Sequence, residues 1–264
     1  MTKEIQKWWD ETTGSYQVSS EIHTKSAHYG PYAPDEAELN LLGNVKGKRV
    51  LEIGCGGGQC SIAFAKKGAI CTGIDISKGQ LKYAEKLAKE NKVKINFVRG
   101  SFQDLSQFKS KSFNIVFSAY ALQYSPDLNK VFRQVNRILK KDGLFVFSFD
   151  HPFYLLINPI SKKLMNSYFD TGRHELVETW QDKTKHKFIF YRVKISDIYN
   201  ALIDSGFFVE KIIEPLSLNK KQIAWTRGSW KKIYPKETVK LIGPTIIFKS
   251  KKLKEFAAPS IKSG

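Results

Sequence analysis

Residues 50–65 read VLEIGCGGGQCSIAFA, and this stretch decides the fold. It opens with a short apolar run, VLEI, which is typical of a buried strand. Four glycines follow within five residues, and apolar residues at helical spacing come next. A strand, a glycine-rich turn and a helix in this order predict the first unit of a nucleotide-binding α/β fold. Glycine allows a tight turn and lets the backbone approach a ligand without an intervening Cβ.

The spacing of the glycines indicates the kind of ligand. Counted from Glu52, the pattern is Glu-x-Gly-x-Gly-x-Gly, with glycine at Gly54, Gly56 and Gly58. A dinucleotide fingerprint is G-x-G-x-x-G, and a phosphate loop needs Gly-Lys-Ser/Thr, so neither motif matches. An acid at the strand end beside an open glycine loop suits a ligand with a cationic amino-acid end. An ordinary glycine-rich βα turn is the alternative that this stretch alone leaves open.

This pattern resembles the first motif of the class I S-adenosylmethionine (SAM) methyltransferases, of the type that acts on small molecules. The resemblance implies SAM as cofactor and a doubly wound, Rossmann-like α/β fold. Its sheet is expected to have seven mostly parallel strands, with strand seven antiparallel. We expect the strands at residues 48–53, 70–74, 93–98, 112–117, 144–149, 207–213 and 245–249.

Asp75 follows the second expected strand, 23 residues after Glu52. An acid at this point of a βαβ unit reaches the ribose hydroxyls of a nucleoside. The run Asp75-Ile76-Ser77 also resembles the "D-x-S" strand end of the family, which places Ile76 on the adenine face. A purely structural Asp75 that caps the next helix is the alternative.

The resemblance extends to further cofactor contacts. Residues 8–16 resemble the N-terminal segment that caps the cofactor in this family, and Tyr16 is its candidate ligand. Residues 118–124 resemble the fourth motif of the small-molecule enzymes; the Asn/Asp-Pro-Pro-Tyr and Pro-Cys signatures of base methyltransferases are absent there. The complete expected cofactor set is Tyr16, Glu52, Gly54, Gly56, Gly58, Asp75, Ile76, Gln80, Ser101, Phe102 and Ala119.

His151 and Tyr120 are the candidate catalytic residues. His151 follows the fifth expected strand directly, and ligands of open α/β sheets bind outside the carboxyl ends of the strands. Histidine titrates near neutral pH and can serve as a general base. Tyr120, with Gln123 or His28, is expected to orient the acceptor. A structural histidine that only makes hydrogen bonds is the alternative for His151.

The chain is expected to consist of a SAM-binding core with additions. We expect a helical cap at 1–43, the Rossmann-like core at 44–150, an aromatic insertion over the substrate at 151–194, and the rest of the core with a basic tail at 195–264. Within the insertion, two strands are expected at 175–181 and 186–193. The alternative is a hairpin that only closes the sheet edge.

Composition limits the partners. The formal net charge is +18, and residues 215–264 carry twelve Lys/Arg against two Asp/Glu. A basic region can attract RNA, so an RNA methyltransferase stays an alternative to the favoured small-molecule acceptor, and a SAM-binding protein without catalysis is another. No apolar run is long enough for a membrane span. The three cysteines do not have the spacing of a metal-binding motif or of a disulfide framework. The N-terminus does not resemble a secretory signal. Together these features favour a cytoplasmic protein.

Overall fold

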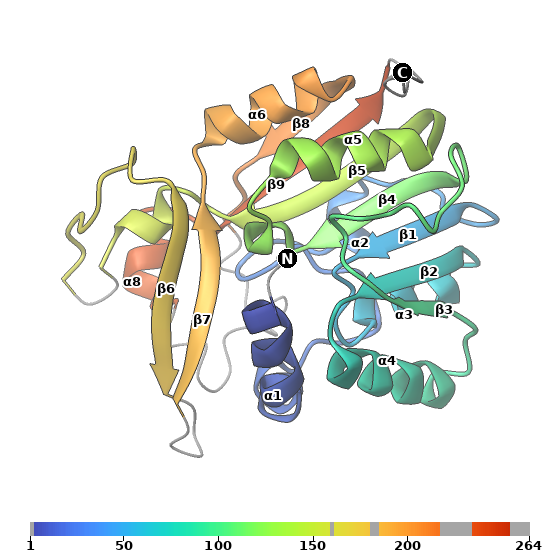
Figure 1. The fold of residues 1–264 in the computed structure, drawn as a ribbon, viewed down its shortest axis with the longest axis horizontal. Helices are drawn as coiled ribbons and strands as arrows, with labels where there is room; N and C mark the ends of the chain where they lie inside the picture. The colour runs from blue at the N-terminus through green and yellow to red at the C-terminus, as the bar shows by residue number, and fades with distance from the viewer. Residues whose placement is uncertain (1–2, 159–160, 180–184, 217–233, 254–264) are drawn as a thin grey trace, which may run out of the picture.

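A seven-stranded mixed sheet forms the centre of the structure (Figure 1). The computed structural model describes residues 3–158, 161–179, 185–216 and 234–253. In spatial order the strands are β3 (Asn96–Arg99), β2 (Ile70–Asp75), β1 (Arg49–Ile53), β4 (Phe113–Ala119), β5 (Leu139–Asp150), β9 (Thr245–Lys252) and β8 (Phe207–Ile213). The first five pair in parallel, and β9 is antiparallel to both of its neighbours. The predicted sheet with an antiparallel seventh strand is therefore confirmed.

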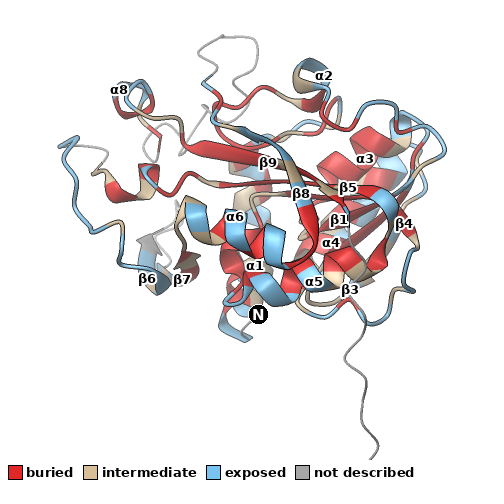
Figure 2. Cartoon of the chain, turned by 90° about the horizontal axis from the view of Figure 1, so that it is seen from above, coloured by how far each residue is buried: buried red, intermediate tan, exposed pale blue. Residues whose placement is uncertain are grey.

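Helices cover both faces of this sheet (Figure 2). They are α1 (Lys3–Ser20), α2 (Glu36–Leu39), α3 (Gln59–Lys66), α4 (Lys78–Glu90), α5 (Leu128–Ile138), α6 (Ile195–Asp204) and α8 (Lys236–Val239), with 3-10 turns η1 (Leu122–Tyr124) and η2 (Tyr154–Leu156). The apolar stripes of α5 and α6 pack on one face, and α3 packs on the other. Doubly wound folds need this arrangement because a parallel sheet must bury both faces.

Strand β5 shows how the sequence supplies both cores. Phe145, Phe147 and Phe149 alternate with smaller residues, so their rings all point toward α5 and α6. Val146, between them, belongs to the core on the opposite face. This alternation follows from the two-residue period of a strand. The burial on both faces explains why the strand reads as a nearly continuous apolar run.

The insertion after β5 forms a separate two-stranded antiparallel sheet. Its strands, β6 (Gly172–Thr179) and β7 (Lys185–Arg192), pair in register from Gly172 with Arg192 to Thr179 with Lys185. The hairpin stands apart from the main sheet, with α1 between it and α4 (Figure 1). The two predicted strands are present, but they do not close the sheet edge.

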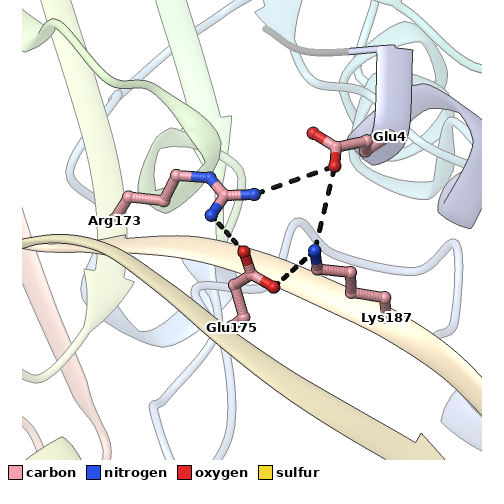
Figure 3. A network of polar contacts seen from close by, with 4 residues as sticks. All are labelled: Glu4, Arg173, Glu175 and Lys187. Atoms are coloured by element: carbon pink, nitrogen blue, oxygen red, sulfur yellow. Dashed lines mark hydrogen bonds and ion pairs between the residues drawn. The ribbon is translucent and has the colours of Figure 1, made fainter.

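Helix α1 holds the hairpin by an apolar contact and by charges. The ring centroids of Trp8 on α1 and Phe188 on β7 lie 4.9 Å apart. Figure 3 shows four charged side chains of α1 and the hairpin, in which Glu4 and Glu175 each pair with Arg173 and Lys187. The pairs to Glu4 are long, 3.8 Å from Arg173 and 4.0 Å from Lys187.

The sequence also predicts a helix at residues 1–13, a helix from Asp35 through Leu42 and a helix capped by Ser196, and their boundaries differ in the structure. Helix α1 continues to Ser20 rather than ending at residue 13, because Gln17 and Ser20 are buried against the core. Helix α2 ends at Leu39 rather than Leu42, since Asn40 adopts the left-handed conformation that terminates a helix. The α6 N-cap is Lys194 rather than Ser196, and the backbone N–H of Lys194 donates to the Asp197 carboxylate at 3.1 Å.

Strand β5 begins five residues earlier than predicted. The run Lys141-Asp142-Gly143 predicts a turn before this strand, but these residues lie inside the strand at an irregularity: Leu139 pairs with Phe113, and Leu144 pairs with Ile115. Asp142 takes a positive φ of 59° at this point.

Some residues of the basic C-terminal region lie outside the described structure, namely Trp225, Trp230 and the tail from residue 256. Among the helices of the described part, none combines the length and apolar character needed to cross a bilayer.

Candidate functional site

A cleft lies at the carboxyl ends of β1, β2 and β4, beneath α1. Side chains and backbone from all these elements line it: Trp9, Tyr16, Gln17, Ile22, His28, Glu52, Gly54, Cys55, Gly56, Gly57, Gln59, Cys60, Asp75, Ile76, Gln80, Phe102, Ala119, Tyr120, Ala121 and Tyr124. The cleft therefore contains nine of the eleven residues predicted to bind a cofactor, and one of the two predicted to act in catalysis. This is the position at which open α/β sheets bind their ligands.

Asp75 joins the glycine loop to the start of α4. One carboxylate oxygen accepts from the Gly56 backbone N–H at 2.8 Å, and the other accepts from the Ser77 N–H at 2.9 Å. Burial raises the pKa of Asp75 to about 6, although these backbone donors act in the opposite direction. Asp75 is half-buried and lines the cleft, and its carboxylate has lone pairs for further donors. The predicted ligand role and the structural role are thus compatible in one side chain.

Glu52 lies at the bottom of the cleft and is almost fully buried, with 3% of its surface exposed. Its carboxylate accepts from both the backbone N–H and the hydroxyl of Ser61, in the first turn of α3. Burial nevertheless raises its pKa to about 7. A cationic group in the cleft would favour the ionised carboxylate, because an opposite charge nearby lowers the pKa of an acid.

The glycines of the loop serve different purposes. A Cβ on Gly54 would lie 2.3 Å from the Cβ of Ala121, so this position must be glycine for β1 and the end of β4 to pack. A Cβ on Gly58 would lie 2.9 Å from Phe97, which makes Gly58 a packing position outside the cleft lining. Gly56, by contrast, has a φ of +50° and faces the cleft. The close approach predicted for a ligand therefore applies to Gly56.

Gln17 of α1 lies over the glycine loop. Its amide donates to Gln80 at 2.7 Å and accepts from Gln59 at 2.6 Å, which links α1 to the starts of α3 and α4. A Cβ on Gly57 would lie 2.5 Å from the Gln17 side-chain nitrogen. Three side-chain amides, from α1, α3 and α4, thus line the cleft together with the main chain of the loop.

Asp10 anchors α1 at the same edge of the cleft. Its carboxylate accepts from the Ser77 hydroxyl at 2.7 Å and from the Gly79 N–H at 3.0 Å. Burial acts to raise the pKa of Asp10, but the hydrogen bonds from Gly79 and Ser77 together hold it below its ordinary value. Helix α1 therefore covers the cleft through specific contacts with the start of α4, where the nucleoside was expected.

Two predicted residues have their polar groups engaged elsewhere. Ser101 is not part of the lining; its hydroxyl accepts from the Gln103 N–H at 3.2 Å, in a local turn. Phe102, next to it, does line the cleft. Tyr120 also lines the cleft, while its hydroxyl donates to the Pro244 carbonyl at 2.6 Å and lies 2.8 Å from the Thr245 hydroxyl.

His151 lies outside the cleft lining and is 2% exposed. Its Nε2 is 2.8 Å from the Glu214 carboxylate, and its Nδ1 accepts from the Phe153 N–H at 3.1 Å. Both ring nitrogens therefore have protein partners that hold the loop after β5. Its catalytic role stays a prediction.

Sequence reasoning predicted Tyr16 of α1 but missed other contributions of this helix and of the following segment. Gln17 and Ile22 carried no local motif that would place them in the cleft. His28 was proposed only as an orienting group; it lines the cleft, and burial lowers its pKa to about 3, so its imidazole is neutral. The nearest signal was the aromatic run at Trp8 and Trp9, which was assigned to a cap.

The residues present fit the SAM cofactor that the family resemblance implies. The Asp75 carboxylate can accept from ribose hydroxyls, Ile76 and Phe102 offer apolar surface to a base, and Glu52 provides negative charge for an amino group. The Gly56 backbone lies open: a Cβ there would meet only the Gln80 side-chain oxygen, at 3.7 Å. Each of these groups lies in the same cleft.

Comparisons with known proteins identify methyltransferases as relatives. Residues 51–147 match the family described as "Methyltransferase domain". Over 145 residues the chain is 32% identical to the ubiquinone biosynthesis O-methyltransferase of Actinobacillus pleuropneumoniae. The aligned region covers 53% of this chain and 58% of that protein. The chain thus spans a little over half the length of such curated relatives.

Solved structures show the same fold over most of the chain. A SAM-dependent methyltransferase from Mesorhizobium loti is 24% identical with a TM-score of 0.62, and the match covers 82% of this chain and 96% of that one. The 4+2 cyclase SpnF is 16% identical with a TM-score of 0.60, covering 94% of each chain. Residues 51–147 therefore belong to the methyltransferase domain family, and the fold around them is that of the class I SAM-dependent methyltransferases.

Proposed function

We propose that this chain transfers a methyl group from SAM to a small-molecule acceptor. The observation that carries the proposal is the convergence of Glu52, the glycine loop and Asp75 in one cleft at the carboxyl ends of β1 and β2. The matching relatives are named for O-methyl transfer, which supports an oxygen atom as the acceptor. Because SpnF shares the fold and is named a cyclase, fold alone does not decide the reaction.

The residues of the cleft would hold the cofactor and shield it. SAM, when bound, supplies a methyl group already activated by a sulfonium. Asp75 accepts hydroxyl donors, and Glu52 with the amides of Gln17, Gln59 and Gln80 orients the charged end. Helix α1 covers the cleft and excludes water, while Trp9 and Tyr16, with ring centroids 4.9 Å apart, form an aromatic wall. Alignment and exclusion of water can supply most of the acceleration for such a displacement.

The test of the cofactor site is the isosteric variant Asp75→Asn. It keeps one acceptor oxygen but removes the charge, and we expect SAM affinity to fall by about 1.5–3 kcal/mol, or roughly 10- to 150-fold. Titration calorimetry measures this directly. Asp142→Asn is the matched control. Asp142 is exposed and lies near the start of β5, away from the cleft, so this variant should bind SAM as the wild type does.

Formation of S-adenosylhomocysteine together with a methylated product establishes the reaction. Wild-type affinity in Asp75→Asn would show that the nucleoside lies elsewhere. A protein that binds SAM but yields no methylated product from any acceptor would be a binding protein or a catalyst of another reaction.

We also propose a reducing, cytoplasmic compartment. Cys55, Cys60 and Cys71 are free and buried around the glycine loop. Burial raises the pKa of all three thiols above the ordinary value, which keeps them protonated and unreactive. Thiol labelling of the folded protein should therefore be slow at all three positions.

A further inference from the structure

Three glutamines from three helices form one chain of hydrogen bonds in the cleft. Gln59 begins α3, Gln80 lies in the first turn of α4, and Gln17 extends from α1, which lies beside α4 (Figure 1). All three line the cleft, and their exposed fractions are 4%, 0% and 7% in that order. Their amides are therefore nearly removed from solvent, although they border the space that would hold a ligand.

The hydrogen bonds of this chain run in one direction. The side-chain nitrogen of Gln59 donates to the Gln17 oxygen at 2.6 Å, and the Gln17 nitrogen donates to the Gln80 oxygen at 2.7 Å. Because each nitrogen donates to the oxygen of the next amide, the two ends of the chain differ. An amide oxygen remains at the α3 end, and an amide N–H2 group remains at the α4 end.

The nitrogen at the α4 end lacks an acceptor. Among the residues that the structure describes, none accepts from Nε2 of Gln80, which is buried. Native proteins seldom leave a buried donor in this state without a functional reason. The Gln80 oxygen already accepts from Gln17, so a rotation of the amide that gave the nitrogen another partner would break that bond. A ligand with an acceptor oxygen at this side of the cleft would satisfy the donor.

The oxygen at the α3 end lies against the glycine loop. It is 2.8 Å from the point that a Cβ on Gly57 would occupy. Two residues further along α3, Ser61 donates its N–H and its hydroxyl to Glu52 at the bottom of the cleft. This side of the cleft therefore presents an amide oxygen and a carboxyl group, whereas Gln80 presents a donor. Such a separation matches an amino acid, because an ammonium needs acceptors and a carboxylate needs donors.

We propose that Gln17 is a positioning residue: from α1 it fixes the direction of the amide chain, so that Nε2 of Gln80 binds the carboxylate at the amino-acid end of the cofactor. This proposal rests on the proposed function. Gln17 acts through Gln80, because its own nitrogen and oxygen both bond to the neighbouring amides. It holds the Gln80 oxygen away from the carboxylate, to which a second oxygen would be repulsive. The helix that covers the cleft thus also determines which charge is recognised beside α4.

The experiment compares two probes by titration calorimetry. One is S-adenosylhomocysteine, and the other is its decarboxylated analogue, S-adenosyl-3-thiopropylamine, which keeps the ammonium but has no carboxylate. Gln80→Met removes the donor, so we expect the Kd of S-adenosylhomocysteine to rise about 10- to 100-fold, as for a lost hydrogen bond to a charged group. The Kd of the analogue should change much less. Gln17→Met should show the same selective loss, because nothing then holds the Gln80 amide in this direction.

The double variant separates a positioning role from a purely structural one. If Gln17 acts through Gln80, then Gln17→Met should add no further loss of selectivity in a protein that already carries Gln80→Met. A weaker hold on α1 affects both probes equally and cancels in the ratio of their Kd values. Gln134→Met is the matched control: Gln134 lies on α5 outside the cleft lining and accepts from Arg137, so the ratio should stay at the wild-type value.

A second readout follows the amide directly. In an NMR spectrum of isotope-labelled protein, the side-chain N–H2 signal of Gln80 is assigned by its loss in Gln80→Met. S-adenosylhomocysteine should shift this signal strongly, because a charged acceptor forms a short hydrogen bond. The decarboxylated analogue should shift it much less. In Gln17→Met the shift caused by S-adenosylhomocysteine should shrink.

The outcomes separate the two proposals. An equal loss for both probes in Gln17→Met, or additive losses in the double variant, would overturn the positioning role of Gln17. A wild type that binds both probes equally well would overturn carboxylate recognition by Gln80 and leave the proposed function in place. Failure of the wild type to bind either probe would instead overturn the proposed function.

Discussion

Three carboxyl groups in and beside the cleft have raised pKa values. Burial raises the pKa of Asp75 to about 6 and those of Glu52 and Asp150 to about 7, from ordinary values near 4. At a given pH, each of these acids is therefore ionised to a smaller extent in the folded chain than in the unfolded chain. In the free protein the ionised form of these acids is disfavoured. A cation or a hydroxyl donor that binds beside them would favour the ionised form. Acids with such shifted pKa values are common at functional sites.

These shifts predict how stability depends on pH. Between about pH 4 and 7 the folded state binds more protons than the unfolded state, so the three acids lower the free energy of unfolding as the pH rises. Asp150→Asn removes one of these charges and should stabilise the protein by a few kcal/mol at pH 8. Below pH 4 the difference should vanish. Urea unfolding at both pH values measures it; a variant less stable than the wild type at pH 8 would contradict the shift.

Helix α1 is the element on which cleft and hairpin both depend. Asp10 and Gln17 hold it to α3 and α4, and Trp8 packs on Phe188 of the hairpin. The charged network in Figure 3 joins the same elements, but its side chains are between 36% and 53% exposed. Exposed ion pairs contribute little, because water and salt screen them.

The apolar contact should therefore matter more than the charges. Trp8 is 6% exposed, and Trp8→Ala should lower the free energy of unfolding by about 3–5 kcal/mol. Glu4→Ala should cost less than about 1 kcal/mol. Chemical denaturation of both variants tests this ranking, and a larger effect from Glu4→Ala would reverse it.

At the scale of the whole molecule, the cleft joins parts that lie far apart in the chain. The sheet provides Glu52, Asp75 and Ala119, while the N-terminal helix provides Trp9, Tyr16 and Gln17. A ligand between them must link the cap to the core. Residues 215–264, with twelve Lys/Arg against two Asp/Glu, hold more than half of the net charge of +18, but much of this stretch lies outside the described structure. The RNA alternative thus rests on charge alone.

Ligand binding should stabilise cap and core together. S-adenosylhomocysteine at 100 times its Kd should raise the free energy of unfolding by about 2.7 kcal/mol. Amide exchange should slow most in α1 and in the glycine loop, because both meet the ligand. Protection confined to the loop, with α1 exchanging as before, would show that the helix does not close over the cofactor.

The local features of this protein followed from its sequence. The β1–glycine–α3 unit, the acid at the end of β2, the strand positions and the antiparallel seventh strand were all predicted, the last from family resemblance. Short-range patterns determine such features because the period of apolar residues and the freedom of glycine act between chain neighbours. Nine of the eleven cofactor candidates, several of them named from the family resemblance, line one cleft.

Only the tertiary structure decided which side chains complete that cleft. Gln17 meets Gln59 and Gln80 from 42 and 63 residues away, and no local pattern encodes such a contact. His151 is a second case. It follows strand β5, whose carboxyl end was expected to face a ligand, yet its ring nitrogens contact Glu214 and the Phe153 backbone outside the cleft lining. Packing, and not residue type or its place after a strand, determined where this imidazole lies.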